Sequence, residues 1–179
     1  FLKKSFASYY QKQTAKFLNT AKSIVATSVF TKEAIIKEYN VKDSAIDVLY
    51  NAVNEIFLPM NHDEKTAVKN QFTDGKEFFL FSGDIHSGNN LLKLLKAFSV
   101  FKKRQQTNMK LMLAGNLAKN YQSFKGDLKS YKYRHDVVLL ENADENTLQK
   151  IIGAAYGLIN PSPYPGFVPS VLQAMKCNV

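Results

Sequence analysis

The stretch FFLFSGDIHSGNNLLKLLKAFSVFKK, from Phe78 to Lys103, predicts the fold of most of this chain. It opens with a short apolar run, FFLFSG, which is typical of a buried strand. A polar loop follows, and then a helix whose apolar residues recur on one face. A second apolar run, KLMLAG at 110–115, comes next. This order indicates two parallel strands joined by a crossover helix.

The same alternation continues toward the end of the chain. DVVLL at 136–140 and GLINPS at 157–162 are predicted strands, and 144–156 and 170–176 are predicted helices. Short apolar strands that alternate with helices indicate an α/β fold with a doubly wound, Rossmann-like parallel sheet. Ligands of such sheets bind at the carboxyl ends of the strands. We therefore expect one functional rim, formed by 82–90, 114–120, 141–146 and 161–168.

The first 57 residues have a different pattern. An amphipathic helix is predicted over 5–21, a short strand over 23–28, and a helix over 30–39 for which Thr31 is the expected N-cap. The pattern changes after Phe57, where a connection rich in turn-forming residues begins. The sequence thus predicts two parts, residues 1–57 and residues 58–179.

Composition is that of a folded protein with a basic surface. The 179 residues are 45% hydrophobic and 22% charged, with 24 Lys and Arg against 15 Asp and Glu, for a net charge of +9. This charge suits an anionic membrane face or a phosphorylated ligand, and a solvated basic surface without a specific partner stays open. Nucleic acid is not expected as a partner, because the aromatic residues do not interleave with a basic stripe.

The single cysteine and the absence of long apolar runs bear on location. Cys177 cannot form an internal disulfide, so a reducing cytoplasmic setting is expected, and we interpret it as a small buried residue. No run reaches the length of a membrane span. We expect a cytoplasmic protein, with the inner face of the membrane as an alternative. The first residue, Phe1, and the last, Val179, suggest a fold truncated at both ends.

The rim segments resemble the C-terminal donor-binding domain of GT-B glycosyltransferases of family 4 (group 1). In that family a strand leads into a Gly-Arg-x-x-x-x-Lys-Asn loop and a helix with an Ala-Phe pair, matched here by Gly83, Asn90, Ala97 and Phe98. NPSPYPGFVPSVLQAM at 160–175 is similar to the family's Pro-Ser-x-x-Glu-Gly-Phe-Gly-x-Pro-x-x-Glu-Ala-Met. Residues 1–57 resemble the end of the acceptor domain and the linker. Residues 58–179 would then be part of the nucleotide-sugar-binding domain.

The resemblance implies an activity and a set of site residues. It implies sugar transfer, mannosyl transfer included, from a nucleotide-sugar donor to a glycan or lipid-linked acceptor in cell-surface polysaccharide or glycoconjugate synthesis. Retention of anomeric configuration is expected, and neither a cofactor nor a metal, in agreement with the lack of metal-ligand spacing on the rim. No catalytic residue is assigned. The expected donor-binding residues are Gly83, Asp84, His86, Asn89, Asn90, Gly115, Ser162, Gly166, Phe167, Val168 and Gln173.

Several of these positions depart from the family pattern. Asp84 and Asn89 stand where the family has the Arg and Lys that hold the diphosphate, and Asp84 would repel it. Pro165 and Gln173 replace the two glutamates that contact the sugar and the ribose. Val168 replaces a glycine, and the adjacent Pro169 offers no N–H to a phosphate. An enzyme with a weak or altered donor site and a catalytically inactive homologue that acts as a binding or scaffold protein both remain open.

Three other rim features have alternative interpretations. His86 could meet a phosphate or a sugar hydroxyl, or it could be an ordinary loop histidine. Asp144 and Glu145 could form an acid/base couple, but their place at a helix start favours a role at the helix N-terminus. Gly115 is most simply the tight turn that an α/β rim requires.

Overall fold

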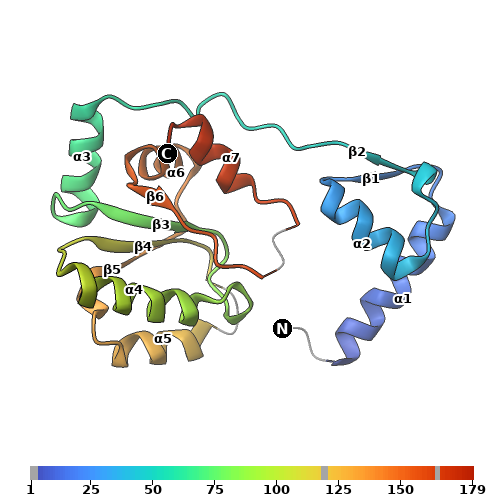
Figure 1. The fold of residues 1–179 in the computed structure, drawn as a ribbon, viewed down its shortest axis with the longest axis horizontal. Coiled ribbons are helices and arrows are strands. Elements are labelled where there is room, and N and C mark those ends of the chain that lie inside the picture. Colours follow the sequence, from blue (N-terminus) through green and yellow to red (C-terminus); the bar gives the residue numbers. More distant parts are fainter. Residues whose placement is uncertain (1–3, 118–120, 164–165) are drawn as a thin grey trace. The chain divides into compact units, whose positions relative to one another are not determined.

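A computed structural model describes residues 4–117, 121–163 and 166–179 (Figure 1). The chain divides into two compact units. Unit 1 comprises residues 1–52 together with 164–168, and unit 2 comprises residues 53–163 together with 169–179. Each unit is described by itself below.

Unit 1 contains a pair of parallel strands packed against a helix. Its strands pair from Ile24↔Ile46 to Ala26↔Val48, and Ile24, Ala26 and Ile46 form its buried core. None of the helices in the described residues is long and apolar enough to cross a membrane. The elements are α1 (Lys4–Thr20), β1 (Ile24–Ala26), α2 (Val29–Tyr39), η1 (Asp43–Ala45) and β2 (Ile46–Val48).

The N-cap expected for α2 is wrong. Ser28 caps the helix: its Oγ accepts a hydrogen bond from the N–H of Thr31 at 3.0 Å. Ser28 has the extended backbone that an N-cap requires, with φ −160° and ψ 161°, whereas Thr31 lies inside the first turn. The helix therefore starts earlier than its apolar periodicity indicated.

Unit 2 is built on a four-stranded sheet in the order β5-β4-β3-β6, in which every pairing is parallel. This confirms the predicted α/β fold with a doubly wound parallel sheet. The expected strand 157–162 is shorter, although Ile159 still donates its N–H to the carbonyl of Leu80 at 2.7 Å. The elements are α3 (His62–Thr73), β3 (Phe78–Ser82), η2 (Ser87–Asn89), α4 (Leu91–Gln105), β4 (Lys110–Gly115), α5 (Tyr121–Ser130), η3 (Arg134–Asp136), β5 (Val137–Glu141), α6 (Glu145–Ala154), β6 (Gly157–Leu158) and α7 (Pro169–Lys176).

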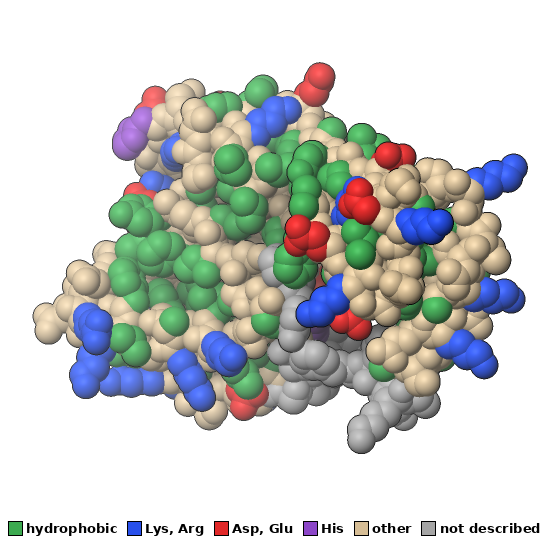
Figure 2. All heavy atoms as spheres, turned by 45° about the vertical axis from the view of Figure 1, so that its right-hand side comes forward, with side chains coloured by type: hydrophobic (Ala, Val, Ile, Leu, Met, Phe, Trp, Pro, Cys, Tyr) green, Lys and Arg blue, Asp and Glu red, His purple; other side chains and the backbone are tan. Residues whose placement is uncertain are grey.

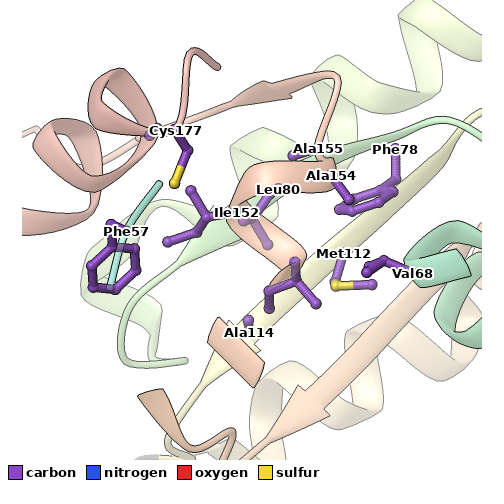
Figure 3. Close-up of a cluster of buried hydrophobic side chains, with 12 residues drawn as sticks. Phe57, Val68, Phe78, Leu80, Met112, Ala114, Ile152, Ala154, Ala155 and Cys177 are labelled. Carbon is purple, nitrogen blue, oxygen red and sulfur yellow. The ribbon is translucent and has the colours of Figure 1, made fainter. Parts of the chain in front are cut away.

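Helices cover both faces of this sheet. On one face α4 and α5 pack their apolar residues against Phe81, Leu111 and Leu113. On the other face, α3, α6 and α7 surround Leu80 and Met112, as Figure 3 shows for the buried cluster. Residues of β3 and β4 alternate between the two faces, which is why continuous apolar runs form these strands. Cys177 belongs to this cluster and is fully buried, which confirms its interpretation as a small buried residue. The buried side chains of the cluster are Phe57, Val68, Phe78, Leu80, Met112, Ala114, Ile151, Ile152, Ala154, Ala155, Ala174 and Cys177.

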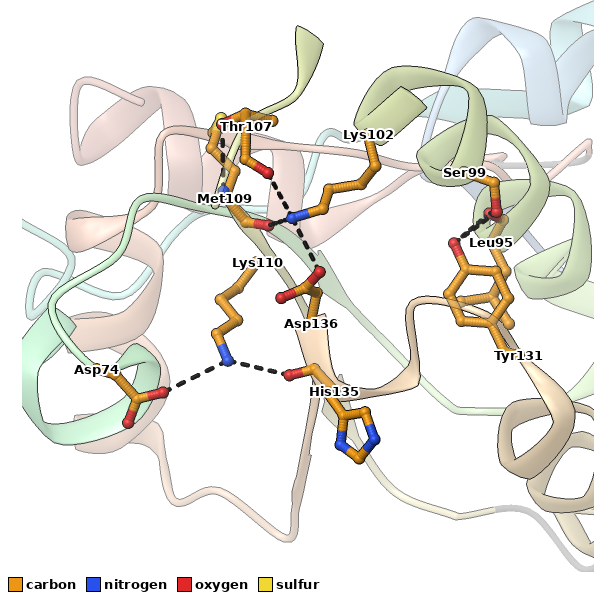
Figure 4. A network of polar contacts seen from close by, with 10 residues as sticks. All are labelled: Asp74, Leu95, Ser99, Lys102, Thr107, Met109, Lys110, Tyr131, His135 and Asp136. Carbon is orange, nitrogen blue, oxygen red and sulfur yellow. Dashed lines mark hydrogen bonds and ion pairs between the residues drawn. The ribbon is translucent and has the colours of Figure 1, made fainter. Parts of the chain in front are cut away.

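A buried lysine holds the amino end of the sheet (Figure 4). The Nζ of Lys102 donates to the carbonyl oxygens of Thr107, at 2.6 Å, and Met109, at 3.2 Å. It also lies 2.9 Å from the carboxylate of Asp136, in an ion pair. Because Lys102 is only 8% exposed, these partners rather than water stabilise its positive charge.

Lys110, the first residue of β4, makes a second attachment at this end. Its Nζ donates to the carbonyl oxygen of His135 at 3.0 Å and lies 3.4 Å from the carboxylate of Asp74. Nearby, the hydroxyl of Tyr131 donates to the carbonyl oxygen of Leu95 at 2.7 Å. These bonds fix the segment between α5 and β5 against its neighbours.

Candidate functional site

The loops that follow β3 and β4 form one continuous structure at the carboxyl end of the sheet. Gly83 donates its N–H to the carbonyl of Ala114 at 3.0 Å, and Ile85 donates to the carbonyl of Asn116 at 2.8 Å. A parallel bridge between Ile85 and Leu117 extends this pairing. Ile85 is fully buried, so the β3 loop is anchored beyond its strand.

Glycines are required where these two loops meet. Gly83 and Gly115 have φ values of +155° and +153°, which side-chain-bearing residues rarely adopt. A Cβ atom built on Gly115 would lie 2.0 Å from the carbonyl oxygen of Gly83. Gly115 is the last residue of β4 and remains paired with Glu141, so the structure shows a close approach of two backbones here and not the predicted tight turn. The close approach leaves backbone groups rather than side chains at the rim.

The rest of the β3 loop is braced by its own side chains. The Nδ1 of His86 accepts the N–H of Gly88 at 3.0 Å, and the Nδ2 of Asn89 donates to the carbonyl of Asp84 at 2.7 Å. Asn90, with φ +54°, donates from Nδ2 to the carbonyl of Pro161 at 3.1 Å. The last bond ties the loop after β3 to the loop after β6, which brings two of the predicted rim segments together.

A cleft of about 180 Å³ opens at this rim. The loops after β3 and β4 form one side, and α6 with the residue before its cap forms the other. The lining includes the carboxyl-bearing Asp84, which is exposed, and no Lys, Arg or His among the described residues. The cleft is therefore electronegative; its lining residues are Ser82, Gly83, Asp84, Ala114, Gly115, Asn116, Ala143 and Leu148.

Asp144 and Glu145 have structural partners at the start of α6. Asp144 is the N-cap: its carboxylate accepts the N–H of Thr147 at 2.7 Å. Hydrogen bonding by the side chain of Thr147, and next by its backbone N–H, holds the pKa of Asp144 below its usual value. Glu145 accepts a hydrogen bond from the Nδ2 of Asn54 at 3.1 Å. The prediction that these carboxylates serve the helix N-terminus is confirmed.

Two more predicted site residues lie in unit 2. Ser162 is half-buried, and its N–H donates to the side-chain oxygen of Asn160 at 3.3 Å. Gln173 is half-buried on α7. The amino end of α7 is attached to the rim, because the hydroxyl of Ser170 donates to the carbonyl of Ser82 at 3.3 Å.

The remaining predicted residues belong to unit 1. Gly166, with φ +55°, Phe167 and Val168 are part of that unit, where the hydroxyl of Ser28 donates to the carbonyl of Gly166 at 3.2 Å. Pro165 lies outside the described residues. The structure thus gathers Gly83, Asp84 and Gly115 in one cleft and places His86, Asn89 and Asn90 as braces of its loop.

Five residues that line the cleft were not among the predicted donor-binding residues: Ser82, Ala114, Asn116, Ala143 and Leu148. The first four lie within the predicted rim segments, and Leu148 lies outside them. Asn116 directly follows Gly115, and Ala143 and Leu148 flank the start of α6. Their positions just after a strand end and around a helix N-terminus were the available signal. Among the described residues, no group of three His, Cys, Asp or Glu side chains lies close enough to hold a metal ion.

A parallel sheet covered by helices on both faces, with a cleft at the carboxyl ends of its central strands, defines a Rossmann-like ligand-binding domain. Comparison with known proteins identifies which kind. The sequence model of the family described as glycosyl transferases group 1 matches residues 62–179, and the chain belongs to this family.

Relatives show how much of such a protein the chain represents. It is 26% identical over 177 residues to the uncharacterized glycosyltransferase MJ1607 of Methanocaldococcus jannaschii, with 91% of this chain and 43% of that protein covered. It is 23% identical to the O-antigen chain mannosyltransferase B of Escherichia coli, with 96% and 45% covered. The chain therefore spans less than half the length of these curated relatives.

A solved structure confirms the GT-B fold. The crystal structure of Anabaena Alr3699/HepE in complex with UDP and glucose superposes with a TM-score of 0.80 at 15% identity, over 93% of this chain and 46% of that one. At this identity the likeness shows the fold alone.

Proposed function

We propose that the protein transfers a sugar from a nucleotide-sugar donor to a glycan or lipid-linked acceptor in cell-surface polysaccharide or glycoconjugate synthesis. The observation that carries this proposal is the cleft between the loops after β3 and β4, within a chain of the group 1 family. Gly83 and Gly115 expose backbone there, where a diphosphate could approach closely. Residues 1–57 would end the acceptor domain and its linker, and residues 58–179 would form part of the donor domain.

The named relatives support the substrate class. One is an O-antigen chain mannosyltransferase, and the structure of HepE contains UDP and glucose. We accordingly propose a hexosyl donor, with a mannosyl donor as the first to test. Transfer with retention and without a metal ion is part of the same proposal, as is a cytoplasmic location at the inner face of the membrane.

Donor binding in this site is proposed to be weak. The described lining of the cleft carries the carboxylate of Asp84 and no cation to offset a diphosphate. A hydrogen bond to a charged group contributes about 1.5–3 kcal/mol, so two missing cations correspond to a large loss of affinity. Asn89 does not compensate, because its amide is engaged with the carbonyl of Asp84.

The same observation favours a second candidate, a catalytically inactive homologue that retains the fold for binding. In that case the protein would act as a binding or scaffold protein, and the negative charge of Asp84 would exclude nucleoside diphosphates from the cleft. The two candidates predict different behaviour toward free donors.

Isothermal titration of the full chain with UDP-glucose, GDP-mannose and the corresponding nucleoside diphosphates tests the proposal. The transferase account predicts saturable binding of at least one nucleotide sugar, with a dissociation constant between about 10 μM and a few mM. The proposal would be overturned, and the inactive homologue favoured, if no compound gave measurable binding at 10 mM. The protein used must show the circular dichroism of a folded α/β domain.

A further inference from the structure

A second concavity lies on the far side of the sheet from β6, beside the edge strand β5. Its volume is about 320 Å³, and it is formed by α5, the η3 turn and β5. Four of its six lining side chains are basic or imidazole groups, and the other two are leucines. They are Lys125, Leu128, Lys129, Arg134, His135 and Leu139. We call this feature the β5 groove.

The charges of the β5 groove are not neutralised. Lys125, Lys129 and Arg134 are exposed, and none of them forms an ion pair within the described part of the chain. Asp136, two residues after Arg134, is already paired with Lys102 at 2.9 Å. Asp127 lies between the two lysines along α5, about 200° from Lys125 around the helix axis, so it points away from their face.

The walls of the groove are held in place from behind. Lys110 donates to the carbonyl of His135 at 3.0 Å, and the hydroxyl of Tyr131 donates to the carbonyl of Leu95 at 2.7 Å. The N–H of Arg134 donates to the carbonyl of Tyr131 at 3.1 Å. The basic side chains therefore project from a fixed backbone, which lowers the entropy cost of binding.

The neighbouring helix α4 also carries basic residues. α4, which is hydrogen-bonded to the same segment through Leu95, carries exposed Lys93, Lys96 and Lys103. Figure 2 shows lysine and arginine side chains gathered along the lower left edge of the molecule, where α4 and α5 lie.

We propose that the β5 groove binds the headgroups of anionic phospholipids and so attaches unit 2 to a membrane surface. The cations match the phosphate, and the half-buried Leu128 and Leu139 between them match the glycerol and upper acyl region. A free phosphate would make no use of these leucines, which is why a lipid is the favoured source. The inference rests on the membrane contact of the proposed function, but its test needs no sugar donor.

Vesicle co-sedimentation of the full chain tests the proposal. The probes are vesicles of phosphatidylcholine with 30% phosphatidylglycerol and vesicles of phosphatidylcholine alone. The groove variant combines Lys125→Gln, Lys129→Gln and Arg134→Gln. A matched variant, called the α1 variant, removes the same charge from α1 and the bend that follows it, with Lys12→Gln, Lys16→Gln and Lys22→Gln. Thermal melting of each variant checks that the fold is kept.

The proposal predicts binding to the anionic vesicles that falls about tenfold or more in the groove variant and less than about threefold in the α1 variant. Equal losses in both variants would show attraction by net charge alone and would overturn it. So would an absence of wild-type binding, or release by inorganic phosphate beyond that by potassium chloride of equal ionic strength. Because no donor is present, loss of sugar binding and loss of membrane binding are measured separately.

Discussion

Gly115 faces the carbonyl oxygen of Gly83 across the rim so closely that a methyl group at position 115 would lie 2.0 Å from that oxygen. The contact joins the two loops that form one side of the candidate donor cleft. It exists because β3 and β4 continue to pair beyond their ends, through Gly83 N–H to Ala114 and Ile85 N–H to Asn116. A side chain at Gly115 must separate the loops.

Gly115→Ala is expected to lower the free energy of unfolding by about 2 kcal/mol or more, through steric overlap and a φ of +153°. Urea denaturation measures this change. Gly126→Ala is the matched control, since Gly126 lies in α5 with nothing within 4 Å of an added Cβ. That variant should gain about 0.5–1 kcal/mol. Equal effects of the two substitutions would contradict the geometry of the rim.

Lys102→Met is expected to destabilise unit 2 by about 3 kcal/mol, because it leaves the Asp136 carboxylate without its cation and two carbonyls without their donor. Chemical denaturation at neutral pH checks this prediction. Lys103→Met, at the exposed neighbouring position, should change the stability by less than about 0.5 kcal/mol. If Lys102→Met leaves the free energy of unfolding unchanged, the network in Figure 4 contributes little to stability.

Cys177 predicts a pH dependence in the alkaline range. Burial raises the pKa of its thiol above the usual value of 9.0, so the folded protein retains a proton that the unfolded chain releases. The contribution of the thiol to the free energy of unfolding is therefore complete below pH 9 and is lost as the pH rises above 9. Wild type should lose stability between pH 9 and 10.5 more steeply than Cys177→Ala when both are followed by urea denaturation. Parallel profiles would show that the thiol titrates alike in both states.

The fold could be predicted from the sequence because each central strand is a continuous apolar run. Phe78–Ser82 and Lys110–Gly115 are buried on both faces, and the helix between them carries its apolar residues on one side. Local patterns of this kind specify secondary structure directly. The positions of Gly83 and Gly115 at the strand ends could be predicted for the same reason.

The roles of several polar residues could not be predicted, because they depend on contacts and backbone conformations that the pattern of residue types does not report. Lys102 and Lys110 look like solvated lysines in the sequence. Both are buried, and their ammonium groups bind carbonyls and carboxylates. The amides of Asn89 and Asn90 hold the carbonyls of Asp84 and Pro161, a structural role that their place in the loop did not indicate. Ser28 replaces Thr31 as a cap through its backbone conformation, which a pattern of apolar residues does not report.

The most direct test of the proposed donor site is the affinity of the Asp84→Arg variant for nucleoside diphosphates. Asp84 is the only charged side chain among the described lining residues, and it stands where the resembling family has a diphosphate-binding Arg. Asn89 is left unchanged because it braces the loop. Asp63→Arg, on the exposed first turn of α3, is the control with the same change of net charge.

Isothermal titration with UDP and GDP compares wild type, Asp84→Arg and Asp63→Arg. If the cleft is the donor site, Asp84→Arg binds at least one diphosphate about tenfold or more tightly than wild type, since a charged hydrogen bond replaces a repulsion. Asp63→Arg should bind like wild type. An unchanged affinity in a folded Asp84→Arg variant, or an equal gain in Asp63→Arg, would contradict the assignment of this cleft as the donor site.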